Sequence, residues 1–209
     1  DYWAKDVHKL GGAKSGYTLM HKGEPIAEIE LSIPGKHNIL NSLACAAACI
    51  YVGMEPEQVA EHIDKFPGAG RRFEILGEVN GVTIADDYAH HPEEITATLS
   101  AAQDMGFNKV WAVFQPFPYS RTKMLLDDFA TSLQIADHVV MTEIMGSREK
   151  NTYNVYTADL AAKIPGSVWF NTFEEMAEHT LKNAKPGDLV ITLGCGDVYK
   201  CAYIMAGIK

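Results

Sequence analysis

Residues 85–94, Ala85-Asp86-Asp87-Tyr88-Ala89-His90-His91-Pro92-Glu93-Glu94, join an apolar run at 82–85 to an amphipathic segment at 92–104. The apolar run predicts a strand, and the second segment predicts a helix, because its apolar residues recur at helical spacing and Pro92 favours a first turn. Two carboxylates, a phenol and two imidazoles therefore lie where a strand ends and a helix begins. Ligands bind at this edge of open α/β sheets, so we interpret the stretch as a site. The alternative is a helix start with an Asp cap and surface histidines.

The composition is that of a globular protein with a sizeable core: 209 residues, 47% of them hydrophobic. The formal net charge of −9 and the lack of a basic patch argue against nucleic acid as a partner. No apolar run approaches the roughly 20 residues that cross a membrane, so no membrane insertion is expected. The four cysteines are interpreted as buried reduced thiols, which fits a cytoplasmic protein. The chain does not begin with Met, and we expect a fragment of a longer protein.

The first third of the chain predicts a small strand-and-helix unit. Residues 1–34 read as short strands, with a hairpin connecting 17–20 to 26–31. An Ala-rich helix is expected at 42–52, where small residues would allow tight packing, and a second helix at 56–65. The Pro- and Gly-rich stretch at 66–70 then predicts a domain boundary. We therefore expect one domain at 1–70 and another at 71–209.

From residue 73 onward, strands and helices alternate. Two strands joined by Asn80-Gly81 predict a hairpin. Further strands are expected at 109–114, 138–142, 168–170 and 189–193, and helices at 92–104, 120–135, 158–164, 173–184 and 198–206. This alternation predicts an α/β fold with a mostly parallel sheet covered on both faces.

Four further motifs lie at strand ends or at the boundary. Asn38 and Asn41 in Gly35-Lys36-His37-Asn38-Ile39-Leu40-Asn41 share a face, where carboxamides could read adenine or simply cap the helix. The segment 71–74 offers arginines for a phosphate or for surface ion pairs. Ser120 could cap the next helix, which would place Arg121 in its first turn, against the dipole preference and suited to an anionic ligand. The stretch 193–197 is either a ligand loop or a tight packing turn.

Together these motifs resemble the Mur ligases of peptidoglycan synthesis. The resemblance rests on 35–41, on Arg72-Phe73-Glu74, on Asp86-Asp87-Tyr88-Ala89-His90-His91-Pro92 and on Phe114-Gln115-Pro116 with Tyr119-Ser120-Arg121-Thr122. It covers essentially the whole chain. It implies the end of a central ATPase domain followed by a complete Rossmann-like C-terminal domain. The implied activity is ATP-dependent ligation of L-alanine to UDP-N-acetylmuramate through an acyl phosphate, completed by hinge closure around residues 67–71.

The resemblance also implies roles for individual residues. Arg72 and His90 would be catalytic, and Arg72 would reach the ATP phosphates. ATP would further contact His37, Asn38 and Asn41 at adenine and Asp87 at ribose. Substrate binding would fall to Tyr88, His90, Tyr119, Arg121, Gly194, Gly196 and Asp197. The main ligands of Mg²⁺ are expected upstream of this segment, and no metal ligand is assigned within it.

Two departures from the family pattern limit what this segment should do alone. Phe117-Pro118 replaces a basic pair that many members have, and the Gly-Lys-Thr/Ser phosphate loop is absent, so the fragment itself should not turn over ATP. Murein peptide ligase of cell-wall recycling has similar motifs and is the nearest alternative, whereas folylpolyglutamate synthase lacks the paired histidines. A non-catalytic nucleotide-binding module is an alternative of a different class.

Overall fold

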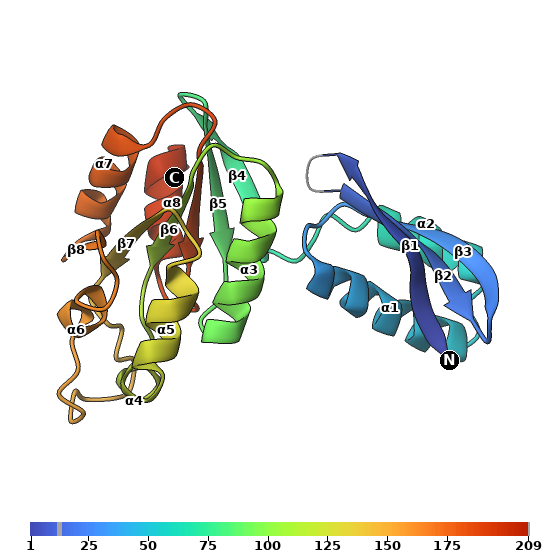
Figure 1. Ribbon diagram of the computed structural model, residues 1–209, viewed down its shortest axis with the longest axis horizontal. Helices are drawn as coiled ribbons and strands as arrows, with labels where there is room; N and C mark the ends of the chain where they lie inside the picture. The colour runs from blue at the N-terminus through green and yellow to red at the C-terminus, as the bar shows by residue number, and fades with distance from the viewer. Residues whose placement is uncertain (12–13, 209) are drawn as a thin grey trace. The chain divides into compact units, whose positions relative to one another are not determined.

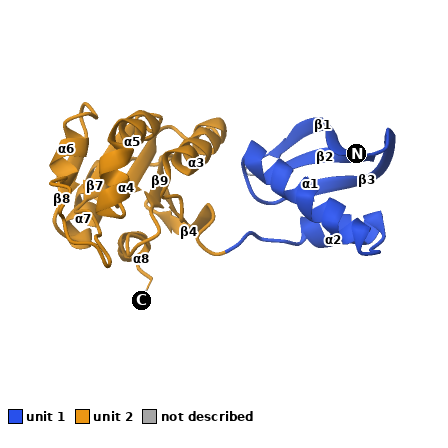
Figure 2. Ribbon diagram, turned by 90° about the horizontal axis from the view of Figure 1, so that it is seen from below, with its two compact units in different colours: residues 1–69 blue, residues 70–209 orange. Residues whose placement is uncertain are grey.

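The computed structural model describes residues 1–11 and 14–208. The chain divides into two compact units, residues 1–69 and residues 70–209 (Figure 2). The division lies one residue before the boundary expected from the sequence, so that Gly70 belongs to the second unit. The two units are described in turn.

Unit 1 is a three-stranded antiparallel sheet packed on two helices (Figure 1). The strands β1 (Tyr2–Gly11), β2 (Lys14–His21) and β3 (Glu24–Leu31) are hydrogen-bonded in chain order. The hairpin between β2 and β3 confirms the prediction for this stretch. Helices α1 (Lys36–Tyr51) and α2 (Pro56–Asp64) close the core, which contains Tyr17, Leu19, Ile29, Leu31, Ile39, Ala46 and Val59.

Helix α1 differs from its prediction in length and in packing. It begins at Lys36 rather than at residue 42, so the 35–41 motif forms its N-cap and first turns. Ala46 is buried, but Ala44 and Ala48 are exposed, so the expectation of tight packing along the Ala-rich stretch was wrong for these two residues. Only one stripe along an amphipathic helix faces the core, at a spacing of three to four residues. Small residues outside that stripe face away from the core.

Unit 2 contains a six-stranded sheet in the order β4-β5-β9-β6-β7-β8. The strands are β4 (Glu74–Val79), β5 (Val82–Asp87), β6 (Val110–Phe114), β7 (His138–Thr142), β8 (Val168–Phe170) and β9 (Leu189–Leu193). Only the edge strand β4 runs antiparallel to its neighbour, and the other adjacent pairs are parallel. The predicted α/β fold with a mostly parallel sheet is confirmed.

Helices cover both faces of this sheet (Figure 1). The helices are α3 (Pro92–Asp104), α4 (Tyr119–Met124), α5 (Leu126–Leu133), α6 (Thr157–Ala161), α7 (Phe173–Asn183) and α8 (Tyr199–Ala206). Residues of α3, α5 and α6 share one core cluster with strand residues such as Ala112 and Ile191. Residues of α7 and α8 share the other cluster with alternate strand residues such as Val113 and Val190. The four inner strands, β5, β9, β6 and β7, are therefore covered on both faces, as parallel strands require.

Two local features of unit 2 differ from the sequence prediction. Strand β5 continues through Asp86 and Asp87, which were expected to follow it. The helix expected at 120–135 is interrupted at Leu125, whose φ of −113° and ψ of 26° separate α4 from α5. No proline or glycine marks this interruption in the sequence. No helix in the described part of the chain is both long and apolar enough to cross a membrane.

Candidate functional site

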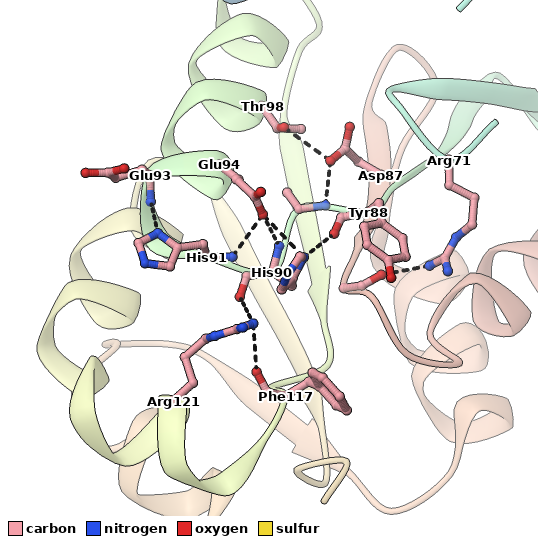
Figure 3. A network of polar contacts seen from close by, with 12 residues as sticks. Arg71, Asp87, Tyr88, His90, His91, Glu93, Glu94, Thr98, Phe117 and Arg121 are labelled. Carbon is pink, nitrogen blue, oxygen red and sulfur yellow. Dashed lines mark hydrogen bonds and ion pairs between the residues drawn. The ribbon is translucent and has the colours of Figure 1, made fainter. Parts of the chain in front are cut away.

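The candidate site lies at the carboxyl edge of the sheet in unit 2. Strands β5, β6 and β9 end next to one another there, because Asp87 and Phe114 both pair with Leu193 of the central strand β9. The segments that follow these strands carry the motifs found in the sequence. Figure 3 shows the side chains that gather around the 86–94 stretch.

Asp86 and Asp87 are both buried at the end of β5, with exposures of 1% and 5%. Asp86 pairs with Arg71 Nε at 2.8 Å and accepts from Thr192 Oγ1 at 2.6 Å. Asp87 accepts from the Phe73 amide at 2.7 Å and the Ala89 amide at 2.8 Å. These contacts use the carboxylates to join the ends of adjacent strands.

Asp87 also accepts from Thr98 Oγ1 on α3 at 3.3 Å (Figure 3). Burial raises the pKa of Asp87, and the hydrogen bonds from Ala89 and Phe73 oppose this shift without cancelling it. Oδ1 has two donors and Oδ2 has one, so one lone pair of Oδ2 is not used by these bonds. The predicted ribose contact would have to use that remaining acceptor.

His90 has a defined tautomer in its neutral form. Its Nδ1 lies 2.9 Å from the Tyr88 carbonyl oxygen and 3.3 Å from Glu94 Oε2, and both are acceptors. We therefore assign the ring proton to Nδ1, which leaves Nε2 as a proton acceptor. The Tyr88 ring contacts the His90 ring edge-on, with centroids 5.3 Å apart. Tyr88 is 37% exposed, so its ring lines an open surface.

His91 and Glu94 begin helix α3 by a capping box rather than by an Asp cap. The Glu93 amide donates to His91 Nδ1 at 3.4 Å, and Glu94 Oε2 accepts from the amides of His90 and His91 at 3.0 and 3.2 Å. Burial would raise the pKa of Glu94, but these hydrogen bonds and the nearby Arg72 outweigh it, so the pKa lies below its usual value. Glu94 is therefore an anion held against His90.

The two arginines at 71 and 72 have different environments. Arg71 donates to Asp86 and, through Nη2, to the Gly194 carbonyl at 2.7 Å. Arg72 is exposed and makes no hydrogen bond or ion pair with the residues that the structure describes; its guanidinium lies 5.8 Å from the Tyr88 ring. Sequence reasoning assigned a role to Arg72 and missed the anchored Arg71. Arg72 lies between two left-handed residues, Arg71 with φ 59° and Phe73 with φ 48°, and the sequence does not reveal this turn.

Arg121 reaches the same edge from helix α4 (Figure 3). Its Nη1 donates weakly to the carbonyls of His90 and Phe117, at 3.3 and 3.4 Å. Within the described residues it has no carboxylate at ion-pair distance. A partly buried cation bonded only to carbonyls has remaining donors for an anion.

The surroundings of Arg121 correct one prediction. Ser120 does not cap α4, because the N-cap is Pro118. Instead the amide and hydroxyl of Ser120 donate to the Glu149 carboxylate at 2.9 and 2.6 Å. The Tyr119 ring packs against Gly146 of the same 143–156 loop. Tyr119 and Ser120 thus attach this loop to α4 beside Arg121.

The 194–197 turn is closely packed. A Cβ at Gly194 would lie 3.2 Å from the Gln115 carbonyl oxygen, and one at Gly196 would lie 2.6 Å from Gln115 Oε1. Asp197 forms an ion pair with Lys200 at 3.0 Å. The chain's own side chains fill the space beside both glycines, which favours the packing-turn interpretation for them. A role of these residues in an amino-acid pocket stays a prediction.

His37, Asn38 and Asn41 lie on α1 of unit 1. Asn38 Nδ2 donates to the Pro34 carbonyl at 2.7 Å, and Asn41 Nδ2 donates to Asn38 Oδ1 at 3.1 Å. The two carboxamides share a face, as their spacing predicts, but they do not cap the helix. His37 is exposed. Asn41 is exposed and keeps its oxygen available for a ligand.

The described residues contain no cluster of three or more His, Cys, Asp or Glu side chains with metal-ligand geometry. The carboxylates at the candidate site are engaged instead with Arg71, with backbone amides and with hydroxyls. Such a donor set does not fit a resident metal ion. We therefore assign no step to a metal held by this chain.

Comparison with known proteins identifies the family of this chain. The Mur ligase glutamate ligase domain model matches residues 71–196. UDP-N-acetylmuramate--L-alanine ligase of Lachnospira eligens is 44% identical over 203 residues, covering 95% of this chain and 44% of the relative. The enzyme of the same name from Acetivibrio thermocellus is 42% identical over 201 residues, covering 94% and 43%.

Solved structures show the same relationship. UDP-N-acetylmuramate-alanine ligase of Thermotoga maritima has a TM-score of 0.80 at 25% identity, covering 99% of this chain and 45% of that one. A murein peptide ligase of Psychrobacter arcticus has a TM-score of 0.67 at the same identity, covering 99% and 44%. The chain thus spans less than half the length of these relatives. Because the family model matches more than half of it, over the unit that carries the site, the chain belongs to the Mur ligase family.

Proposed function

We propose that this chain is part of an ATP-dependent ligase that joins L-alanine to UDP-N-acetylmuramate. The observation that carries the proposal is the 42–44% identity, over about 95% of the chain, to relatives named for that reaction. Unit 1 would be the end of a central ATP-binding domain, and unit 2 the C-terminal domain. The geometry of unit 2 supports the assignment, because its unpaired cations and its free imidazole nitrogen converge on one sheet edge.

Two successive group transfers define what the site must do. A carboxylate oxygen of UDP-N-acetylmuramate attacks the γ-phosphorus of ATP, which forms an acyl phosphate and releases ADP. The alanine amine then attacks the acyl carbon, and the carbon–oxygen bond to phosphate breaks. Negative charge develops on the phosphoryl oxygens in the first transfer. In the second transfer, inorganic phosphate leaves as an anion. Fixed cations therefore stabilise the transition states of both transfers.

Arg72 is suited to the phosphates of ATP. Its guanidinium is exposed, without a partner in the described part of the chain, and borders the Tyr88 ring. A guanidinium in this state can meet phosphate oxygens with two parallel hydrogen bonds. Arg72 also lies close enough to Glu94 to lower the pKa of that carboxyl, which places its charge beside His90.

His90 is suited to accept a proton from the alanine ammonium. Because its Nδ1–H is directed at the Tyr88 carbonyl and Glu94, Nε2 is the nitrogen that can take a proton. The Glu94 carboxylate would stabilise the imidazolium that results. Deprotonation makes the amine a nucleophile, so His90 would act in the second transfer.

Arg121 is suited to a substrate carboxylate. It approaches from α4 and donates to the His90 carbonyl, and its remaining donors have no anionic partner in the described residues. A carboxylate there would replace two long hydrogen bonds to carbonyls with charge-assisted ones. The carboxylate of alanine fits this place, because its amine would then lie towards His90. Tyr119, on the same helix, would line the same substrate surface.

The nucleotide would use the remaining residues. Asp87 has one lone pair for a ribose hydroxyl, although its other bonds hold the strand ends together. Asn41 would contact adenine through its free oxygen, with Asn38 and His37 beside it on α1. ATP would be the only cofactor that this segment touches; any Mg²⁺ would be held by other parts of the protein and by the phosphates.

A ligase assay of the full-length protein tests this proposal. It would measure phosphate release from ATP with UDP-N-acetylmuramate and either L-alanine, other amino acids, or the tripeptide used by a murein peptide ligase. We expect phosphate release with L-alanine, and none from the 209-residue chain alone, which has no phosphate loop. Turnover with the tripeptide instead of L-alanine would assign the recycling reaction. Nucleotide binding without any turnover would identify a binding module.

A further inference from the structure

Two hydrogen bonds and two aromatic rings anchor the Arg71 side chain at the candidate site. Its Nε donates to Asp86 at 2.8 Å and its Nη2 to the Gly194 carbonyl at 2.7 Å. The guanidinium also lies between two aromatic rings, 5.1 Å from the centroid of Tyr88 and 4.7 Å from that of Tyr199. Each of these contacts is of a kind that favours arginine over lysine.

The backbone of Arg71 is fixed as well. Its amide donates to Glu74 at 2.7 Å, and its carbonyl accepts from the Tyr88 amide at 2.7 Å. A left-handed residue costs free energy unless the surroundings determine it, so these bonds must maintain the φ of 59°. The Arg71 side chain reaches the carboxyl ends of β5 and β9, whereas Arg72 is exposed.

The contacts of Arg71 join the two segments that form the site. Asp86 precedes the 87–94 stretch on β5, and Gly194 opens the turn after β9. The Tyr88 ring, held by the guanidinium, in turn contacts the ring of His90 edge-on. A displacement of Arg71 would therefore reach His90 through Tyr88 (Figure 3).

We propose that Arg71 is a positioning residue, which fixes Tyr88 and the 194–197 turn so that His90 faces the reacting groups. It acts through these neighbours and does not itself bind ATP or substrate. The assignment rests on the proposed ligase function. It adds a division of labour between adjacent arginines, in which Arg71 orders the site and Arg72 meets the phosphates.

The test is Arg71→Lys in the full-length protein, with Arg148→Lys as the matched control, because Arg148 is exposed and makes no hydrogen bond or ion pair within the described residues. Lysine keeps a cation beside buried Asp86, so the variant should fold, but its single nitrogen cannot reproduce the two separate, rigidly placed donors that Arg71 offers to Asp86 and to Gly194. We expect kcat to fall at least about tenfold, because small misplacements of catalytic groups are costly. The KM for ATP should stay within about threefold, because Arg72 is unchanged. The control should match wild type.

Hydrogen exchange of the 209-residue chain gives a readout that does not depend on activity. In Arg71→Lys, exchange should rise about fivefold or more at 88–91 and 194–197, and stay unchanged in α4. A wild-type kcat in a folded Arg71→Lys protein overturns the proposal, even if its melting temperature is lower. If the wild-type protein is not a ligase, the proposed function fails. The hydrogen-exchange result is then the only test. Unchanged exchange rates at 88–91 and 194–197 in Arg71→Lys overturn the positioning role, and faster rates support it.

Discussion

The backbone amide of Phe73 donates to Oδ2 of the buried Asp87 at 2.7 Å, so one carboxylate ties the start of β4 to the end of β5. The same carboxylate accepts from Ala89 and from Thr98 on α3. Asp87 therefore joins a strand, a loop and a helix at the candidate site. The contribution of Asp87 to stability can be measured by denaturation, separately from any effect on the KM for ATP.

We predict that Asp87→Ala lowers the free energy of unfolding by about 2–4 kcal/mol, because it leaves buried donors unpaired. Urea denaturation of the 209-residue chain measures this, with Glu178→Ala on the exposed face of α7 as the control. Asp87→Asn keeps an acceptor and should fold well enough for kinetics. If Asp87 also binds ribose, that variant should raise the KM for ATP more than it lowers kcat. Unchanged stability in Asp87→Ala would contradict the structural part of this account.

The pH dependence of stability should distinguish Glu94 from Asp87. The folded pKa of Glu94 lies below its usual value, so its contribution is present above about pH 4.5 and is lost as the pH falls through the folded pKa. The folded pKa of Asp87 is raised above 3.8, so its contribution is present below that pH and is lost as the pH rises through the folded pKa.

Two variants measure these opposite signs. The stability lost in Glu94→Gln should be greater at neutral pH than in acid. The stability lost in Asp87→Asn should be greater in acid than at neutral pH. Urea denaturation at a series of pH values between about 3 and 7 is the measurement. If the stability loss of Asp87→Asn were also greater at neutral pH, burial would not be the dominant influence on the pKa of Asp87.

Much of the fold of unit 2 could be predicted because its signals are local. Apolar strand runs and the Asn80-Gly81 turn identify the sheet and its hairpin, and β7, β8, β9 and α3 have the predicted bounds. The break at Leu125 could not be predicted, because no residue nearby disfavours a helix. It is a consequence of tertiary packing, which propensity does not contain.

The sequence indicated which motifs belong to the candidate site, but not the contacts of their individual side chains. The sequence placed each motif at the end of a strand. Which motifs lie next to one another depends on the order of the strands in the sheet. Which of Arg71 and Arg72 is anchored depends on a turn in which both Arg71 and Phe73 are left-handed, and the acceptors of Asp87 are occupied by the distant Phe73 and Thr98. Ser120 was predicted to cap the helix because the nearby sequence does not show its hydrogen bond to Glu149, which lies 29 residues away.

Arg121→Ala should affect substrates unequally. Its present hydrogen bonds are long and go to carbonyls, so we expect a stability loss of under about 1 kcal/mol. Loss of a charge-assisted bond to a substrate carboxylate costs on the order of 1.5–3 kcal/mol. The KM for alanine or for UDP-N-acetylmuramate should therefore rise about 10- to 150-fold, and that for ATP much less. Arg148→Ala is the control. Equal increases for all three substrates would argue against a specific carboxylate contact.

Unit 2 should fold without unit 1. Both of its core clusters lie within residues 70–209. A protein of residues 70–209 should give one cooperative urea transition, and the position of that transition should change little when unit 1 is present. A non-cooperative transition would show that unit 2 depends on other parts of the protein.

His90 carries the central claim, because its free Nε2 is the only group to which we assign a proton transfer. The most direct measurement is steady-state kinetics of His90→Ala in the full-length protein, together with its melting temperature. General acid–base catalysis contributes about 10²–10⁴-fold, so kcat should fall by about 100-fold or more while the KM for ATP and the melting temperature change little. A folded His90→Ala protein with wild-type kcat would contradict the account and would make the 86–94 stretch a structural helix start.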